Sequence, residues 1–234
     1  MGKGWKVAGM QEKAAQKGKI FTKMAREISV AAKLGGPDPE ANSRLKLAII
    51  AARGASVPKD TIERAVKKGS GQLDDGSVIE ELVYEGVGPH GIGVIVECQT
   101  DNKNRTVSEI RNIFRRHDGN MGETGSVGWM FDRVSVVVAE KAEIGDPEED
   151  AIEAGANEVE KNDDGTYAFI GGLTDLDAIR GALAERGWNV KAAERIYRAK
   201  NFAELTGEAR KEVEDMIADF EDCDDSQKVY TTLA

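Results

Sequence analysis

Cysteine and histidine are scarce in this chain of 234 residues, which has two of each. Cys98 and Cys223 are far apart and in no metal-type spacing, so we expect reduced thiols in a cytoplasm rather than a disulfide framework. We also expect both to be small buried side chains. His90 and His117 lie in no pattern that would orient a general base toward a nucleophile.

Long apolar runs are missing as well. No stretch approaches the roughly 18 apolar residues that a membrane-spanning helix needs. The first ten residues lack the continuous apolar core of a secretory signal. We therefore expect a cytoplasmic protein that has no membrane partner.

The sequence contains none of the common catalytic or metal-binding signatures, such as H-E-x-x-H, a Walker A loop, a nucleophile elbow or a cysteine cluster. Residues 140–164 hold eleven Asp and Glu but lack the spacing of a calcium loop, which indicates a solvated acidic surface. Gly86, Gly88 and Gly91 match the spacing of a dinucleotide fingerprint, yet a strand pattern follows where a helix is needed. We expect no enzyme, no metal, no cofactor and no small-molecule substrate.

What the chain does have is segregated charge. Residues 1–70 hold fifteen Lys and Arg against six Asp and Glu, or +9, and the rest carry −19, which together give the net charge of −10. Because the Debye length is about 8 Å at physiological salt, a distant acidic domain hardly weakens the field of a basic one. This distribution favours a polyanionic partner for the N-terminal part.

Apolar residues recur at helical spacing from Lys19 to Leu34. Lys19, Lys23, Arg26 and Lys33 fall within about 40° of one line on the opposite side of this helix. The sequence predicts that this cationic stripe is exposed and has no balancing acids. The stripe is the main candidate surface for binding nucleic acid.

Two further helices are predicted before residue 70. One runs near Ala41–Arg53, after a stretch of glycines and prolines, and the next begins at Pro58 and ends with Lys67-Lys68-Gly69. Residues 70–77 have the small polar composition of a linker. The sequence therefore predicts a basic three-helix domain over residues 1–77.

After the linker, the apolar period changes from 3.6 to 2. The expected elements are strands at Ile79–Glu85 and Ile92–Cys98, a helix at Thr106–His117, a strand at Val127–Phe131, and a final helix and strand at residues 208–220 and 228–233. Residues 134–196 show the order β-α-β-β-α-β of a ferredoxin-like unit. We predict an α+β protein in which two ferredoxin-like α/β domains follow the helices and the third domain is inserted in the second. The expected bounds are 78–132 with 203–234, and 133–202, while three consecutive domains are the competing topology.

Several strings in this sequence together resemble the YebC/PmpR family. They are K-G-K-I-F-T-K-M-A-R-E-I, L-G-G-P-D-P-E-A-N-S-R-L and V-P-K-D-T-I-E-R-A-V-K-K-G within residues 17–69, Y-E-G-V-G-P-H-G at 84–91, T-D-N-K-N-R-T at 100–106 and G-N-M-G-E-T-G-S-V at 119–127. The resemblance covers nearly the whole chain and implies three domains and a regulatory function. The first ten residues depart from the family's usual start, and the last residues keep only part of its usual ending.

Two functions agree with the resemblance, a DNA-binding transcriptional regulator and a ribosome-associated, RNA-binding translation factor. A third hypothesis is a protein-interaction adaptor that acts through its acidic domain. We expect a monomer that binds duplex DNA or, in the alternative, ribosomal RNA. The residues expected to contact nucleic acid are Lys3, Lys6, Lys13, Lys17, Lys19, Lys23, Arg26, Lys33, Lys67, Lys68 and Arg105.

Overall fold

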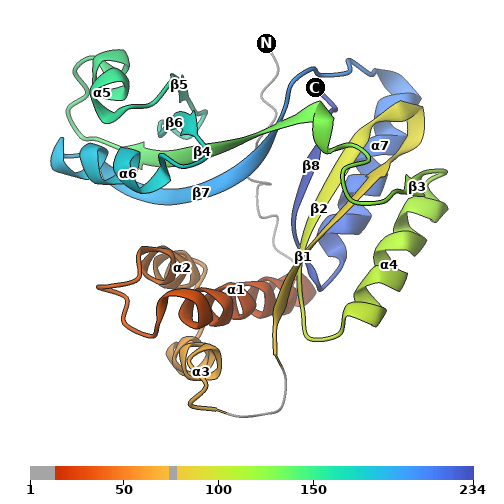
Figure 1. The fold of residues 1–234 in the computed structure, drawn as a ribbon, viewed down its shortest axis with the longest axis horizontal. Helices are drawn as coiled ribbons and strands as arrows, with labels where there is room; N and C mark the ends of the chain where they lie inside the picture. The colour runs from red at the N-terminus through yellow and green to blue at the C-terminus, as the bar shows by residue number, and fades with distance from the viewer. Residues whose placement is uncertain (1–13, 74–77) are drawn as a thin grey trace. The chain divides into compact units, whose positions relative to one another are not determined.

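The structure is a computed structural model that describes residues 14–73 and 78–234, with residues 14–17 described by their backbone alone. It has N-terminal helices and two antiparallel sheets (Figure 1), which confirms the predicted α+β class. The chain divides into two compact units: unit 2 is Arg133–Arg198, and unit 1 is the chain up to Asp132 and from Ala199 on. None of the described helices is both long enough and apolar enough to span a membrane.

Three helices form the N-terminal part of unit 1. They are α1 (Ala14–Gly35), α2 (Ser43–Gly54) and α3 (Lys59–Gly69). Asn42 caps α2, because its side chain accepts a hydrogen bond from the amide of Leu45 at 3.0 Å. The helices share one apolar core, to which α1 contributes Ile28, Ala31 and Ala32.

The contact between α1 and α3 is close. The Ser29 hydroxyl donates to the carbonyl of Ala65 at 2.9 Å. A Cβ on Gly69 would overlap the carbonyl oxygen of Ser29, so only glycine fits this position without displacement of a helix. These two contacts fix the position of α3 on α1.

The first sheet also belongs to unit 1 and has the strand order β3-β1-β2-β8. Its strands are β1 (Glu80–Val87), β2 (Gly93–Thr100), β3 (Asn120–Met121) and β8 (Ser226–Thr231). The hairpin between β1 and β2 turns through Pro89–Gly91, so Gly88 and Gly91 serve a turn, as the strand pattern predicted. Gly86, which was also expected in the turn, lies in β1 and pairs with Val94. β8 pairs antiparallel with β2 and follows unit 2 in the chain.

Helices α4 (Lys103–Arg116) and α7 (Gly207–Asp222) pack together against the sheet of unit 1. Apolar residues from both helices and from β2 make one core, in which the rings of Phe114 and Phe220 meet edge to face at 4.8 Å. Both cysteines are buried here, as predicted. Burial raises the pKa of Cys98 and of Cys223, which keeps their thiols protonated.

Two predictions for this region, the start of α4 and the strand at Val127–Phe131, are wrong. α4 begins at Lys103 instead of Thr106, because the Asn102 side chain caps it by accepting from the amide of Arg105. Val127–Phe131 is not a strand of this sheet. The buried carboxylate of Glu85 accepts backbone N–H groups of this segment, including that of Val127 at 3.0 Å, and holds it as a loop.

Unit 2 contains the second sheet, with strand order β5-β6-β4-β7. Its elements are β4 (Phe131–Glu140), α5 (Pro147–Ala154), β5 (Glu158–Lys161), β6 (Tyr167–Gly172), α6 (Leu176–Glu185) and β7 (Asn189–Ala199). This order confirms the predicted ferredoxin-like succession. Trp188 lies in the core, and its indole N–H donates to Asp150 at 2.8 Å.

Candidate nucleic-acid interface

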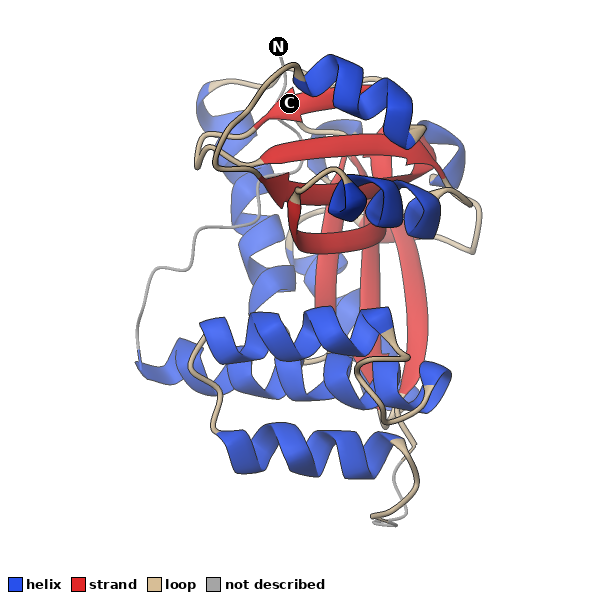
Figure 2. Ribbon diagram, turned by 90° about the vertical axis from the view of Figure 1, so that its left-hand side faces the viewer, coloured by secondary structure: helices blue, strands red, loops and turns tan. Residues whose placement is uncertain are grey.

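The cationic stripe of α1 contacts the chain itself. The ammonium group of Lys19 lies 2.7 Å from the carboxylate of Asp222, at the end of α7. Lys23 donates to the carbonyl oxygen of Glu221 at 2.6 Å. The prediction that the stripe is exposed and has no balancing acids is therefore wrong, because α1 lies against the junction between α7 and β8 (Figures 1 and 2).

This contact affects the two lysines in opposite ways. The hydrogen bond that Lys19 donates to the carboxylate of Asp222 raises the pKa of Lys19. Burial lowers the pKa of Lys23, because its ammonium group loses water and gains a carbonyl oxygen in place of a carboxylate. Lys23 is thus a packed residue, and Lys19 belongs to a partly exposed ion pair.

Arg26, the third member of the stripe, meets a buried carboxylate. Its guanidinium lies 3.0 Å from Asp225, whose side chain is 2% exposed, and also donates to the carbonyl of Asp224. Thr106 donates to Asp225 at 2.7 Å. Burial by itself would raise the pKa of Asp225, but hydrogen bonds from Thr106 and Arg105 and the charge of Arg26 keep it below its ordinary value.

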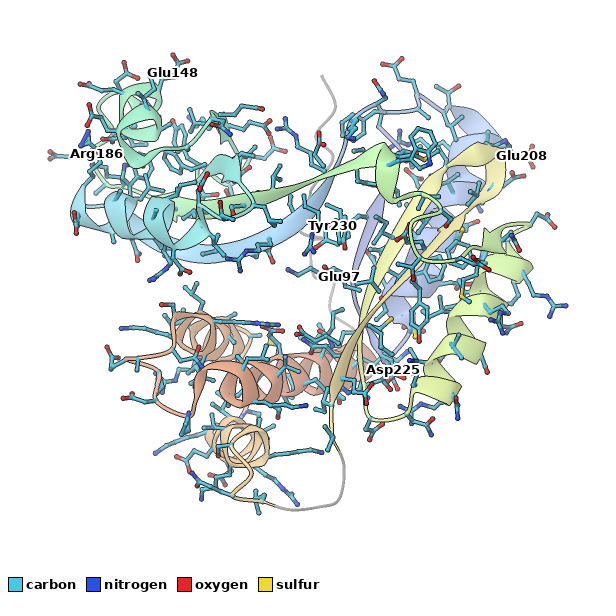
Figure 3. All side chains as sticks on the ribbon, viewed as in Figure 1. Glu97, Glu148, Arg186, Glu208, Asp225 and Tyr230 are labelled. Carbon is cyan, nitrogen blue, oxygen red and sulfur yellow. The ribbon has the colours of Figure 1, made fainter. Side chains whose placement is uncertain are left out.

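Arg105 is tied to the same carboxylate. It lies 3.1 Å from Asp225 and 3.1 Å from Asp101, and its side chain is 49% exposed. Asp225 (labelled in Figure 3) therefore joins the start of α4 to α1 and to the start of β8. The geometry gives Arg105 a structural role, and contact with nucleic acid through its exposed part stays a prediction.

The remaining predicted residues are placed as follows. Lys33 is exposed and donates to the carbonyl of Ile79 at 3.2 Å. Lys3, Lys6 and Lys13 lie outside the described residues, and the side chain of Lys17 is not described.

An open groove of about 380 Å³ lies between α1 and α3. Arg26, Arg64 and Lys68 line it, and Asp101 is an acidic residue at its wall. The carboxylate of Asp101 is engaged by Arg105 and Arg26 by Asp225, whereas Arg64 forms no ion pair with a residue that the structure describes. Lys67 is exposed next to Lys68 at the end of α3. The structure thus brings the predicted Lys67 and Lys68 together with Arg64, which the sequence reasoning did not single out.

A second cationic surface was also missed. Arg111 and Arg115 are exposed on α4, and neither forms an ion pair with a residue that the structure describes. The signal was present as arginines four positions apart on a predicted helix whose opposite side is apolar. It was overlooked because the region after residue 70 has a negative net charge as a whole.

Among the described residues, no group of three or more His, Cys, Asp or Glu could hold a metal ion.

These features define a class: an α+β protein with cationic surfaces on its helices. The sequence profile of the TACO1/YebC protein N-terminal domain matches residues 6–72. The profile of the TACO1/YebC second and third domain matches residues 79–233. The chain belongs to the TACO1/YebC family, which confirms the resemblance seen in the sequence.

Relatives carry the name probable transcriptional regulatory protein. One from Bdellovibrio bacteriovorus is 61% identical over 233 residues, which cover 100% of both chains. One from Pseudomonas syringae pv. syringae is 45% identical over 236 residues and also covers 100% of both chains. These names indicate a regulatory role and not a catalytic one.

A solved structure shares the fold. The crystal structure of a conserved hypothetical protein from Aquifex aeolicus has 36% sequence identity and a TM-score of 0.85. The match covers 98% of this chain and 96% of that chain. The fold described above is therefore shared with that protein.

Proposed function

We propose that this protein is a nucleic-acid-binding transcriptional regulator that binds the phosphate backbone of duplex DNA through cationic residues of unit 1. The names of its relatives support the regulatory part of the proposal. The charge of +9 over residues 1–70 supports a polyanionic partner. That the protein acts as a monomer in the cytoplasm stays a prediction.

The observation that carries the proposal is the cationic end of α3. Arg64 and Lys67 are exposed and form no ion pair with a described residue, and Lys68 lies one helical turn after Arg64 along the same groove. Cations that no neighbouring acid neutralises are free to replace the counterions of a phosphate backbone. Lysines at phosphates act as point charges, so this surface supplies affinity more than sequence preference.

The stripe of α1 enters the proposal in a changed form. Lys19 and Arg26 are held by acidic side chains, so a phosphate would have to compete with Asp222 and Asp225 for them. Arg64 and Lys67 face no such competition, because neither forms an ion pair with a residue that the structure describes. We therefore propose α3 as the first contact.

The test is fluorescence anisotropy with a labelled DNA duplex, an RNA duplex of the same sequence and a single strand, at salt concentrations between about 50 and 200 mM. We expect Arg64→Glu to weaken binding of the DNA duplex and to reduce the salt slope by about 1. The matched control is Arg53→Glu, because Arg53 is also an exposed arginine of this bundle with no ion pair among the described residues. It should leave binding unchanged.

Two outcomes would redirect the proposal. Retention of RNA or ribosomes, but not of DNA, at equal salt would favour the translation factor. Binding to no polynucleotide at all would refute both and favour the adaptor hypothesis. The adaptor hypothesis is tested by neutralising Glu148 and Glu149, which are exposed on α5. Asp146 and Asp150 are left unchanged, because Asp146 caps that helix and Asp150 binds Trp188.

A further inference from the structure

The outward side of α4 has the composition of a surface that reads DNA. Asn104, Ser108, Arg111 and Arg115 follow one line along this helix, at spacings of four, three and four residues, and Asn112 lies beside them. All five are exposed. With a rise of about 1.5 Å per residue, this row is roughly 17 Å long.

The positive charge of this row is not balanced locally. Arg111 and Arg115 form no ion pair with any residue that the structure describes. The acidic groups nearby are engaged elsewhere: Asp101 binds Arg105, and Asp219 of α7 binds both Arg116 and His117. Glu109 lies at the flank of the row and is the one acid on α4 itself.

Helix α4 is held rigidly in place. Its inward residues Ile110, Ile113 and Phe114 are buried in the core of unit 1. Its first turn is tied to the buried Asp225 through Arg105, and its end is tied to α7 through Arg116. A rigid helix loses little conformational entropy when it binds a partner.

Duplex DNA is the partner that matches this surface. The major groove of B-form DNA is about 12 Å wide and admits an α-helix. The corresponding groove of an RNA duplex is too narrow for side chains to read, and the row has no aromatic side chain on which an unpaired base could stack. Arginine and asparagine are the side chains that make paired hydrogen bonds to guanine and adenine edges.

We infer that α4 enters the major groove of duplex DNA and that Arg111 and Arg115 contact base edges there. This inference rests on the proposed function and deepens it, because it assigns sequence preference to α4 while α3 supplies phosphate contacts. Selectivity then depends on a helix of the α/β part of unit 1, outside the basic N-terminal segment.

The experiment uses the full chain and a pool of DNA duplexes with a randomised centre, from which bound duplexes are recovered and sequenced. Two double variants are compared with the wild type, Arg111→Gln/Arg115→Gln and Arg111→Lys/Arg115→Lys. The first should lower the affinity for the selected duplex about tenfold or more, because bidentate contacts are lost. The second keeps the charge and loses the fork geometry, so it should keep the salt slope and lose the selected motif.

Controls separate the possible failures. Lys46→Gln/Arg53→Gln removes the same charge from exposed positions on α2 and should leave the motif unchanged. Far-UV circular dichroism and thermal melting show whether each variant folds. If the wild type binds duplexes and all three variants recover the same motif with the same affinity, the inference is overturned while the proposed function stands. If the wild type binds no duplex, both are overturned.

Discussion

Loss of the Asp225 carboxylate should destabilise unit 1 more than loss of any exposed acid beside it. The perturbation is Asp225→Ala, which removes the acceptor of Thr100 and Thr106 and the counter-ion of Arg26 and Arg105. The side chain is 2% exposed, so water cannot replace what is lost. Three segments that are distant in the sequence, α1, the start of α4 and the start of β8, lose their common contact.

The expected magnitude follows from the burial of the group. Removal of one partner from a buried, hydrogen-bonded ion pair costs about 3–5 kcal/mol of unfolding free energy. The exposed half of Arg105 can regain water, so the lower part of that range is expected. For a unit of this size, each kcal/mol lowers Tm by roughly 2–4 °C, so the loss should be about 6–12 °C.

The assay is urea unfolding followed by circular dichroism and by fluorescence. Circular dichroism reports both units, and fluorescence contains the signal of the buried Trp188 of unit 2, whose transition should stay in place. Asp224→Ala is the control, because Asp224 is exposed one position away. A loss below about 1 kcal/mol, comparable to the control, would show that Asp225 is not the connection described above.

The same carboxylate gives a pH dependence. Because the pKa of Asp225 is lowered in the folded state, its stabilising contribution is present above the unfolded value of about 3.9 and is lost as the pH falls through the lower folded value. Below about pH 4, the stability of the wild type should therefore fall more steeply than that of the Asp225→Ala variant. Parallel profiles over this range would contradict the assigned shift.

Three further predictions concern other parts of the chain. Glu85→Gln should cost about 2–3 kcal/mol in urea unfolding, since the carboxylate accepts three backbone N–H groups of the loop after β3, and an unchanged midpoint would refute this. Gly69→Ala should lower Tm through overlap with α1, while Gly54→Ala, which meets no atom within 4 Å, should leave Tm unchanged or raise it. Asp150→Asn should cost about 2–3 kcal/mol and change the fluorescence of unit 2, because the carboxylate binds Lys141 and the buried indole; an unaltered emission spectrum would refute it.

The fold was largely predictable because its elements have strong local patterns. The ferredoxin-like succession in unit 2 was predicted from alternation and helical spacing, and these periodicities reflect the burial of one face of each element. The segment at Val127–Phe131 was misassigned for a non-local reason. Its apolar residues resemble a strand, but the carboxylate of Glu85, about forty positions earlier, satisfies its backbone N–H groups.

The candidate site was less predictable, because the charged neighbours of a residue in the sequence differ from its charged neighbours in the folded chain. Lys19 and Arg26 have no acid at helical spacing on their own face, so the sequence favoured a free cationic stripe. Their partners Asp222 and Asp225 lie about two hundred residues later, and only the folded chain brings them together. Lys67 and Lys68 were predicted from a local signal, because a run of lysines at a helix end needs no distant information, and their contact with nucleic acid stays a prediction.

The contact between α1 and the end of α7 also limits how nucleic acid can bind. A duplex that used the stripe of α1 would have to separate Arg26 from Asp225 and leave that carboxylate buried without its counter-ion, which is costly in a low-dielectric interior. A duplex that used Arg64, Arg111 and Arg115 would displace only counterions and water. Since the second route breaks no internal ion pair, the cations of α3 and α4 should determine affinity, and α1 should support the structure that presents them.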